Sequence, residues 1–110
     1  MSTILETLRA ARELLSDPAH WTKGVEARTA SGIPVDPANA NACCWCTAGA
    51  IFQVSPAGDS IVRLHVFGAL AAQAGRGVAD YNDLPETTHA GILSWFDKTI
   101  EAVSAKELKQ

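Results

Sequence analysis

The sequence lacks the features that define several large classes of protein. Its longest apolar stretches, residues 42–52 and 61–72, are well short of the ~20 residues that a membrane-spanning helix needs. Residues 1–6 have neither the basic stretch nor the long apolar run of a signal peptide. Lys and Arg number 9 against 12 Asp and Glu, for a net charge of −3, and they are scattered rather than clustered. These absences argue against membrane association and against nucleic acid as the main partner.

Cysteine is scarce, and its three copies stand together. Cys43, Cys44 and Cys46 fall within four positions, and an odd number so closely spaced is not a disulfide framework. We therefore expect a reducing compartment, the cytoplasm. No second C-x-x-C and no H-x-x-x-H pattern accompanies the cluster, so the sequence shows no closed set of four zinc ligands.

The remaining composition is that of one globular domain. Hydrophobic residues make up 47% of the chain and charged residues 19%, a balance that excludes a disordered protein. A chain of 110 residues buries enough surface to fold without disulfides or metals but has no room for a second core. We predict a single domain spanning residues 1–110.

The two outer helices of this domain are marked by capping patterns. Residues 4–15 repeat apolar side chains at helical spacing and follow a capping box that begins at Thr3. A second capping box, beginning at Asp83, precedes an amphipathic pattern that predicts the last helix from residue 85 or 86 to residue 105. Both patterns predict helices with one buried face.

The two middle helices are expected to be interior. One is predicted from about Cys44 to residue 54, and the next from about residue 60 to a stop at Gly75. No charged residue stands between residues 36 and 59, and Arg63 is the only one between residues 60 and 75. Helices that are apolar on all sides are usually buried. We therefore place these two at the centre of the fold.

The segment between the first and second helices is irregular and contains a hairpin pattern. Residues 25–28 and 33–35 flank a turn at residues 29–32, which predicts a short β-hairpin. Pro34 is tolerated only at the edge of a sheet, so a small ribbon is expected. The predicted fold is mainly α: a compact four-helix domain with a short β-hairpin arm between helices 1 and 2.

The cysteine cluster is one candidate for a nucleophilic site. It stands at the expected start of a buried helix, where the partial positive charge of the helix end favours a thiolate. His89 would act as the base and Asp83, or Asn82, would orient it, if the fold brings them together. On this interpretation Cys44 or Cys46 attacks an acyl group, and the candidate catalytic residues are Cys44, Cys46, His89 and Asp83.

Two other interpretations of the cluster stay open. Cysteine is among the most buried residue types and often acts as a small hydrophobic side chain. Alternatively, Cys43 and Cys46 have the spacing that binds zinc, and a histidine could complete the set: His20, His65 or His89. Residues two apart point to opposite sides of a helix, so Cys44 and Cys46 could not both bind one metal if both were helical.

Other residues suggest ligand contacts or simple packing. Trp21 stands in a loop bounded by proline and glycine, where it could stack on a planar ligand or cover the core. Arg28 could bind an anion or lie along the hairpin as a solvated charge. Asp83 precedes the last helix, and capping is the commonest role of an acidic residue there.

The order of these motifs resembles a small bacterial and phage family of unknown function. The similarity spans nearly the whole chain and rests on residues 17–18, 21–24, 27–28, 32, 35–37, 44–46, 49–50, 82–83 and 88–90. The resemblance gives weight to Cys44, Trp45, Cys46, Asn82, Asp83 and His89. It also implies that Cys43 is an extra residue, which weakens the zinc interpretation. The candidate ligand-binding residues are Trp21, Arg28, Trp45 and Asn82.

The chain departs from that family pattern at several positions. Thr29 and Ser31 stand where acidic residues are usual, and Tyr81 stands where a Trp is usual. Gly91 replaces a common Glu after the Thr-His-Ala run, which removes a capping box at Thr88 and leaves Asp83 or Thr87 to begin the last helix.

Three functions follow, in order of preference. The first is a small intracellular, non-catalytic binding or regulatory domain whose partner is a protein or a small molecule. The second is a cysteine-dependent hydrolase or acyl-transfer enzyme, and the third is a small zinc-binding domain. No cofactor is expected, no metal is assigned, and the oligomeric state is open, with a homodimer among the options.

Overall fold

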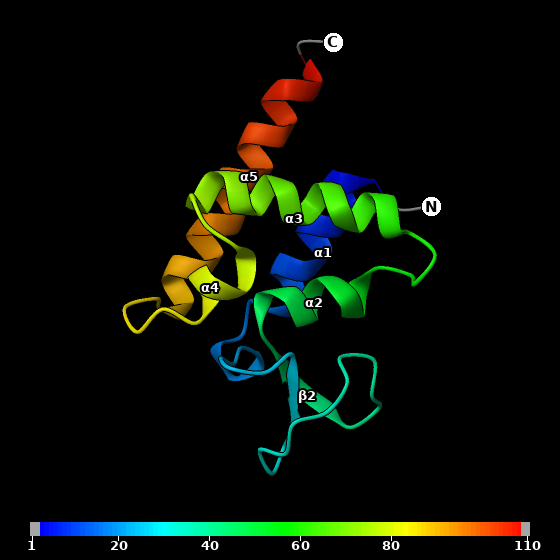
Figure 1. Cartoon of the computed structure of the whole chain (residues 1–110), viewed down its shortest axis with the longest axis vertical. Helices are drawn as coiled ribbons and strands as arrows, with labels where there is room; N and C mark the ends of the chain where they lie inside the picture. Colours follow the sequence, from blue (N-terminus) through cyan, green and yellow to red (C-terminus); the bar gives the residue numbers. More distant parts are fainter. Residues whose placement is uncertain (1–2, 109–110) are drawn as a thin grey trace.

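The computed structural model describes residues 3–108 and is mainly helical, with one small antiparallel pair of strands. The helical body carries at one end an arm, residues 25–45, and the last turns of the C-terminal helix project from the other end (Figure 1). The elements in chain order are α1 (Ile4–Leu14), the 3-10 helix η1 (Pro18–His20), β1 (Ala27–Thr29), β2 (Ala42–Trp45), α2 (Thr47–Val54), α3 (Ser60–Ala74), α4 (Val78–Asn82) and α5 (His89–Leu108).

Helix α1 forms as predicted. The Thr3 hydroxyl accepts a hydrogen bond from the Glu6 amide, and the Glu6 carboxylate accepts one from the Thr3 amide, each at 3.0 Å. This capping box also lowers the pKa of the Glu6 carboxyl, because the Thr3 amide and hydroxyl bond to its charged form. Farther along α1, the Arg12 guanidinium bonds to the Asp97 carboxylate and so joins α1 to α5.

The arm has a different strand pairing from the one expected. Strand β1 pairs with β2, so Ala27 lies opposite Trp45. The expected partner at residues 33–35 is no named strand, but it does lie against β1 through an antiparallel bridge between Arg28 and Pro34 and two backbone hydrogen bonds of 2.9 and 3.0 Å. The predicted turn does form, with the Gly32 amide donating to the Thr29 carbonyl at 2.9 Å. The alternating strand pattern of residues 42–45 was hidden by the apolar run that continues into the next helix.

Helix α2 therefore begins three residues later than predicted, at Thr47 rather than Cys44. Cys46 is its N-cap residue, and its sulfur accepts a hydrogen bond from the Gly49 amide at 3.3 Å. Gly49 lies against the arm: an added Cβ would stand 1.9 Å from the Glu26 carbonyl oxygen. The close approach of helix and arm requires glycine at this position.

Helix α3 forms with the predicted bounds, and Gly75 ends it with a φ of +72°. The prediction that it is interior is wrong. Only Val66 and Leu70 of this helix are buried, whereas Ile61 and Leu64 are 71% and 69% exposed. Helix α3 lies across the body as an outer layer, with α1 behind it and α2 below it in Figure 1.

The chain between α3 and α5 differs from the prediction in two ways. A short helix, α4, occupies residues 78–82, so the described residues contain five α-helices rather than four. Helix α5 begins at His89 instead of residue 85 or 86, because the Thr88 hydroxyl accepts from the Gly91 amide at 3.1 Å. The expectation that Asp83 or Thr87 begins this helix is thus wrong, because the Thr88 hydroxyl caps it without the Glu.

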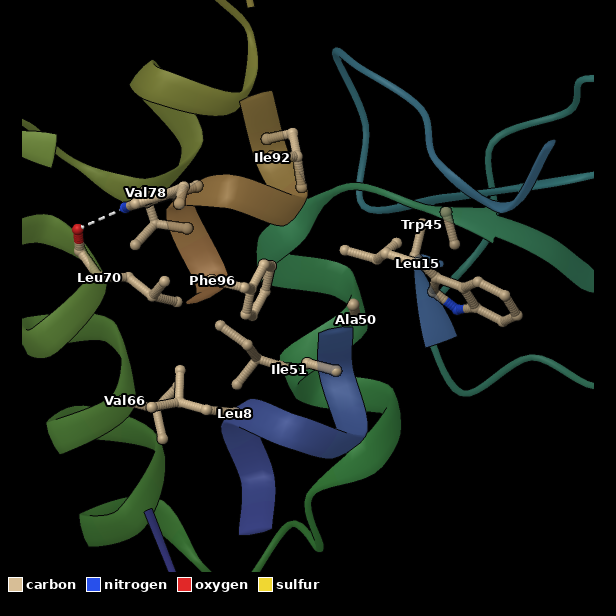
Figure 2. Packing of buried hydrophobic residues seen from close by; sticks show 13 residues of the cluster. Leu8, Leu15, Trp45, Ala50, Ile51, Val66, Leu70, Val78, Ile92 and Phe96 are labelled. Carbon is tan, nitrogen blue, oxygen red and sulfur yellow. Dashed lines mark hydrogen bonds between the residues drawn. The ribbon is translucent and has the colours of Figure 1, made fainter. Parts of the chain in front are cut away.

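The hydrophobic core lies where α1, α2, α3 and α5 meet. Leu8 of α1, Ile51 of α2 and Phe96 of α5 are fully buried and point toward one another (Figure 2). Val66 and Leu70 of α3 close the core on one side. The predicted stripe of α5 is confirmed at Ile92, Trp95, Phe96 and Thr99, all of which are buried. Among the described residues, none of the helices combines the length and hydropathy of a membrane-spanning segment.

Candidate functional site

The junction between the arm and the helical body is organised by Asn82. This residue ends α4, is fully buried, and uses both atoms of its amide. Its Oδ1 accepts from the Trp21 indole at 2.9 Å and from the amide and hydroxyl of Thr47 at 3.0 and 2.8 Å. Its Nδ2 donates to the Thr22 carbonyl at 3.2 Å and to the Asp83 carboxylate at 2.9 Å. One amide thus joins the loop after α1, the start of α2 and the end of α4.

Asp83 extends this junction. Its Oδ1 also accepts from the Gly24 amide at 3.0 Å, and Lys23 donates to the Leu84 carbonyl at 2.6 Å. Asp83 therefore holds the loop before the arm and is not bonded to the start of α5. The capping role expected for it belongs to Thr88 instead.

Arg28 acts within the arm. Its Nε donates to the Thr22 hydroxyl at 3.1 Å, while its terminal nitrogens donate to the carbonyls of Gly32 and Lys23 at 3.2 and 3.3 Å. The guanidinium group thus joins the loop before β1 to the turn after it. An arginine bonded on three sides by its own chain is held in one orientation.

The two tryptophans of the site cover the arm's contact with the body. Trp45 is buried, and its indole donates to the Pro37 carbonyl at 3.0 Å. Trp21 is partly exposed, pairs with Trp45 through a backbone bridge, and has its ring 6.1 Å from the His89 ring. Trp45 in Figure 2 stands at the arm side of the core, beside Leu15.

The three cysteines have different surroundings. Cys46 is buried, Cys44 is partly exposed and Cys43 is exposed, and all three are free thiols. Cys43 and Cys44 lie in β2, so their side chains point to opposite faces of the ribbon. The Cys44 sulfur lies 4.0 Å from the Arg28 carbonyl oxygen.

Electrostatics hold the Cys46 thiol in its neutral form. Burial raises the pKa of this thiol above its ordinary value of 9.0, and the nearby carboxylates of Asp83 and Glu26 raise it further. The amides of Gly49 and Ala48 act in the opposite direction but do not reverse the shift. The helix start that was expected to favour a thiolate is therefore outweighed by desolvation.

His89 is placed by α1 rather than by the cysteines. Its Nε2 lies 2.6 Å from the Leu15 carbonyl oxygen at the end of α1, and because a carbonyl can only accept, this nitrogen is the donor. The predicted catalytic groups lie near the same end of the body, connected through Trp21 and Asn82. Each hydrogen-bonds with other partners: Cys46 with Gly49, His89 with Leu15, and Asp83 with Gly24 and Asn82.

The described part of the chain contains no group of three or more His, Cys, Asp or Glu side chains arranged to hold a metal ion. The zinc interpretation needed Cys43 and Cys46 on one side of the backbone. Cys43 is exposed in β2 and Cys46 is buried at the start of α2, so the two sulfurs have different environments.

Comparison with known proteins places the chain in a family. The sequence model of a family of unknown function, DUF6197, matches residues 1–102. The chain belongs to this family. No curated protein and no solved structure matches it. The family assignment agrees with the resemblance inferred from the motifs and brings no activity with it.

Sequence reasoning missed two residues of the junction in this DUF6197 chain. Thr47 supplies two of the donors to Asn82, and Gly49 permits the contact with Glu26. A signal for both was present, because Cys46-Thr47 precedes a helical run and Gly49 stands in its first turn. Recognising it required placing the start of α2 after the cysteines, and the predicted start at Cys44 hid it.

Proposed function

We propose that the protein is a non-catalytic binding or regulatory domain, a single unit over residues 1–110 that works in the cytoplasm of a bacterium or in a phage-infected cell. One observation carries the proposal: the Cys46 sulfur is buried and accepts the hydrogen bond that caps α2. A thiol in that position supports the fold, as a serine or threonine does at other helix starts.

The surroundings of Cys46 do not favour a cysteine nucleophile. Such a residue needs a lowered pKa and a base within hydrogen-bond reach. Burial instead raises the pKa of Cys46. The hydrogen bond of His89 is with Leu15, and Asp83 accepts from Gly24 and Asn82 instead of orienting the imidazole.

The four candidate ligand-binding residues take a supporting role in this proposal. Asn82 and Trp45 are buried, and Arg28 has three partners within the chain. Their polar groups fix the arm against the body. Trp21 is partly exposed, so of the four it is the residue that a ligand bound at the arm would contact.

Thiol labelling across pH tests the proposal against the cysteine enzyme and the zinc domain. The variant with Cys43→Ser and Cys44→Ser leaves Cys46 as the only thiol, and we expect it to react with an alkylating reagent only on unfolding. His89→Ala should leave that rate unchanged, as should the control His65→Ala, because His65 is exposed on α3.

Two results would contradict the proposal. A fast reaction of Cys46 in the folded protein, slowed by His89→Ala but not by His65→Ala, would favour the cysteine-dependent enzyme over the binding domain. Stoichiometric zinc in the native protein by mass spectrometry, lost on changing Cys43 and Cys46, would establish the metal domain.

A further inference from the structure

Helix α3 has the composition of a buried helix and the position of an exposed one. Its single charged residue, Arg63, donates to the Ser55 hydroxyl and to the carbonyls of Phe52 and Ser55 at the end of α2. The outer side of α3 is thereby left without charge. We call this outer side, formed by Ile61, Leu64, Gly68, Ala72 and Gly75, the α3 strip; these positions follow one another at helical spacing and all are exposed.

The α3 strip is bordered by a hollow. The last turns of α5 project beyond α3 (Figure 1), and the corner between the two helices contains a surface cavity of about 720 Å³. Leu64, Gly68 and Ala72 of α3 line it, together with Val103 and Lys106 of α5. Exposed leucine and isoleucine beside a mostly apolar hollow are typical of a contact surface.

We propose that the α3 strip binds a second copy of this chain, with the two α3 helices antiparallel around Gly68. The proposal rests on the non-catalytic binding function proposed above and names its partner. It is suggested by the distribution of side-chain size along the strip. The first half carries the bulky residues Ile61 and Leu64, and the second half carries the small residues Ala72 and Gly75.

Antiparallel pairing places bulky residues against small ones. With Gly68 at the centre, Leu64 faces Ala72 of the second copy, and Ile61 faces Gly75. An added Cβ at Gly68 would meet nothing within 4 Å, so the space above it is open to a partner helix. A two-fold contact of this kind is self-complementary and closes as a dimer.

Charges at the two ends of α3 match the same arrangement. Asp59 precedes the helix and Arg76 follows it, at nearly equal distances from Gly68 in the sequence. Asp59 is partly exposed and makes no side-chain capping bond; its Oδ2 is buried without a hydrogen-bond partner among the described residues, so its exposed part carries the charge toward the second copy. Arg76 is exposed. Antiparallel pairing brings each Asp59 to an Arg76 of the other copy, whereas parallel pairing brings like charges together.

The contact is small. A helix of 15 residues is about 22 Å long, so the α3 strip and its border with α5 supply less than the ~800 Å² per partner of a standard interface. We expect a dimer with a dissociation constant on the order of micromolar.

Sedimentation equilibrium of the full chain over a wide concentration range tests the proposal. We expect monomer and dimer in exchange. Gly68→Lys places a charge where each copy meets itself and should weaken dimerisation by at least about tenfold. The matched control Ala38→Lys adds the same charge at an exposed turn of the arm and should have no effect. Because the space at Gly68 is open, the variant monomer should melt no lower than the parent.

A charge exchange tests the antiparallel direction. Arg76→Glu alone and Asp59→Lys alone should each weaken the dimer, and the chain carrying both changes should recover it. A protein that stays monomeric at every concentration overturns the proposal, and leaves the α3 strip to a different partner. A dimer that tolerates Gly68→Lys, or that the double exchange fails to restore, overturns it as well. These results are independent of Cys46 labelling, so failure of the dimer and failure of the non-catalytic function are distinguishable.

Discussion

Asn82 is the residue on which the placement of the arm depends most. A buried amide accepts through its oxygen and donates through its nitrogen, so a side chain that lacks either group leaves some of its partners without a hydrogen bond. Its partners come from three separate parts of the chain: the loop at Trp21, the start of α2 at Thr47, and Asp83.

Asn82→Asp should therefore be strongly destabilising. The change replaces a donor with a carboxylate oxygen that faces the Thr22 carbonyl and the Asp83 carboxylate. We expect the free energy of unfolding to fall by about 3 to 5 kcal/mol, as for other uncompensated buried charges. Denaturant unfolding measures it. Asn39→Asp is the matched control, because Asn39 is exposed and its side chain only accepts. Equal stability of the two variants would disprove the role of Asn82.

Cys46 links protein stability to alkaline pH. The pKa of its thiol is raised in the folded state, so above pH 9 the unfolded chain loses this proton while the folded chain keeps it. Stability then falls as the pH rises through the interval between the unfolded and folded pKa values. Cys46→Ser keeps a capping oxygen and removes the titration, so its unfolding free energy should fall less steeply above pH 9 than that of the parent. If the pH dependence of the unfolding free energy were unchanged in Cys46→Ser but lost in Cys44→Ser, the effect would belong to Cys44 and the prediction for Cys46 would be wrong.

The sequence predicted which side chains gather at the junction, but it did not predict the hydrogen bonds that they make there. Cys46, Asn82, Asp83 and His89 all stand at the junction of arm and body. Their roles depend on which atoms come within about 3 Å of each other, and this is decided by the packing of α1, α4 and the arm. A motif could not show that the carbonyl of Leu15 would reach His89.

The contact of α2 with the arm shows how a single missing Cβ sets the position of an element. Gly49→Ala would place a methyl group within 1.9 Å of the Glu26 carbonyl, which also accepts from the Cys46 amide. The helix or the arm must move. We expect a loss of about 3 kcal/mol in unfolding free energy, despite the better helix propensity of alanine.

Gly68→Ala is the control for that prediction. Gly68 lies inside a helix with open space around it, so alanine there should stabilise the monomer by up to ~1 kcal/mol. Thermal melts at low protein concentration compare the two. Similar effects of both alanines would show that helix propensity, rather than the contact with Glu26, governs position 49.

The start of α5 and the loop before the arm should respond to different substitutions. Thr88→Ala removes the cap of α5 and should cost about 1 kcal/mol. Asp83→Ala removes the acceptor of the Gly24 amide and should speed hydrogen exchange at Gly24 without affecting the amide of Gly91. Faster exchange at Gly91 in Asp83→Ala would return the capping role to Asp83.

At the scale of elements, the sequence predicted α1, α3 and the end of α2 well because their boundaries have local causes. Thr3 caps α1, Gly75 ends α3, and a proline follows α2. The start of α2 and the partner of β1 were missed for a non-local reason. Residues 42–45 are apolar enough for either a helix or a strand, and pairing with residues 27–29 decides between them.

The whole molecule combines a helical body with an arm that has little core of its own. Its strands are short; Trp45 and Ala27 are its buried members of the main hydrophobic cluster, and Val35 and Ala42 pack against that cluster while partly exposed. The arm is held by the hydrogen bonds of Asn82, Asp83 and Cys46 rather than by an independent core. The apolar pattern of α3 predicted an interior helix, whereas the described chain buries only Val66 and Leu70 of it and leaves Ile61 and Leu64 exposed.

Cooperative unfolding of arm and body follows from this organisation. If the Cys46 cap and the Asn82 amide hold the two parts together, the Cys46 thiol becomes accessible only when the whole chain unfolds. The thiol can then serve as a probe of the junction.

The most direct measurement is the alkylation rate of Cys46 in the Cys43→Ser, Cys44→Ser chain as a function of denaturant. Our account predicts that the free energy of opening derived from this rate equals the free energy of global unfolding and has the same dependence on denaturant. A low opening free energy that does not vary with denaturant would contradict it, because the thiol would then be reached while the helical body remains folded.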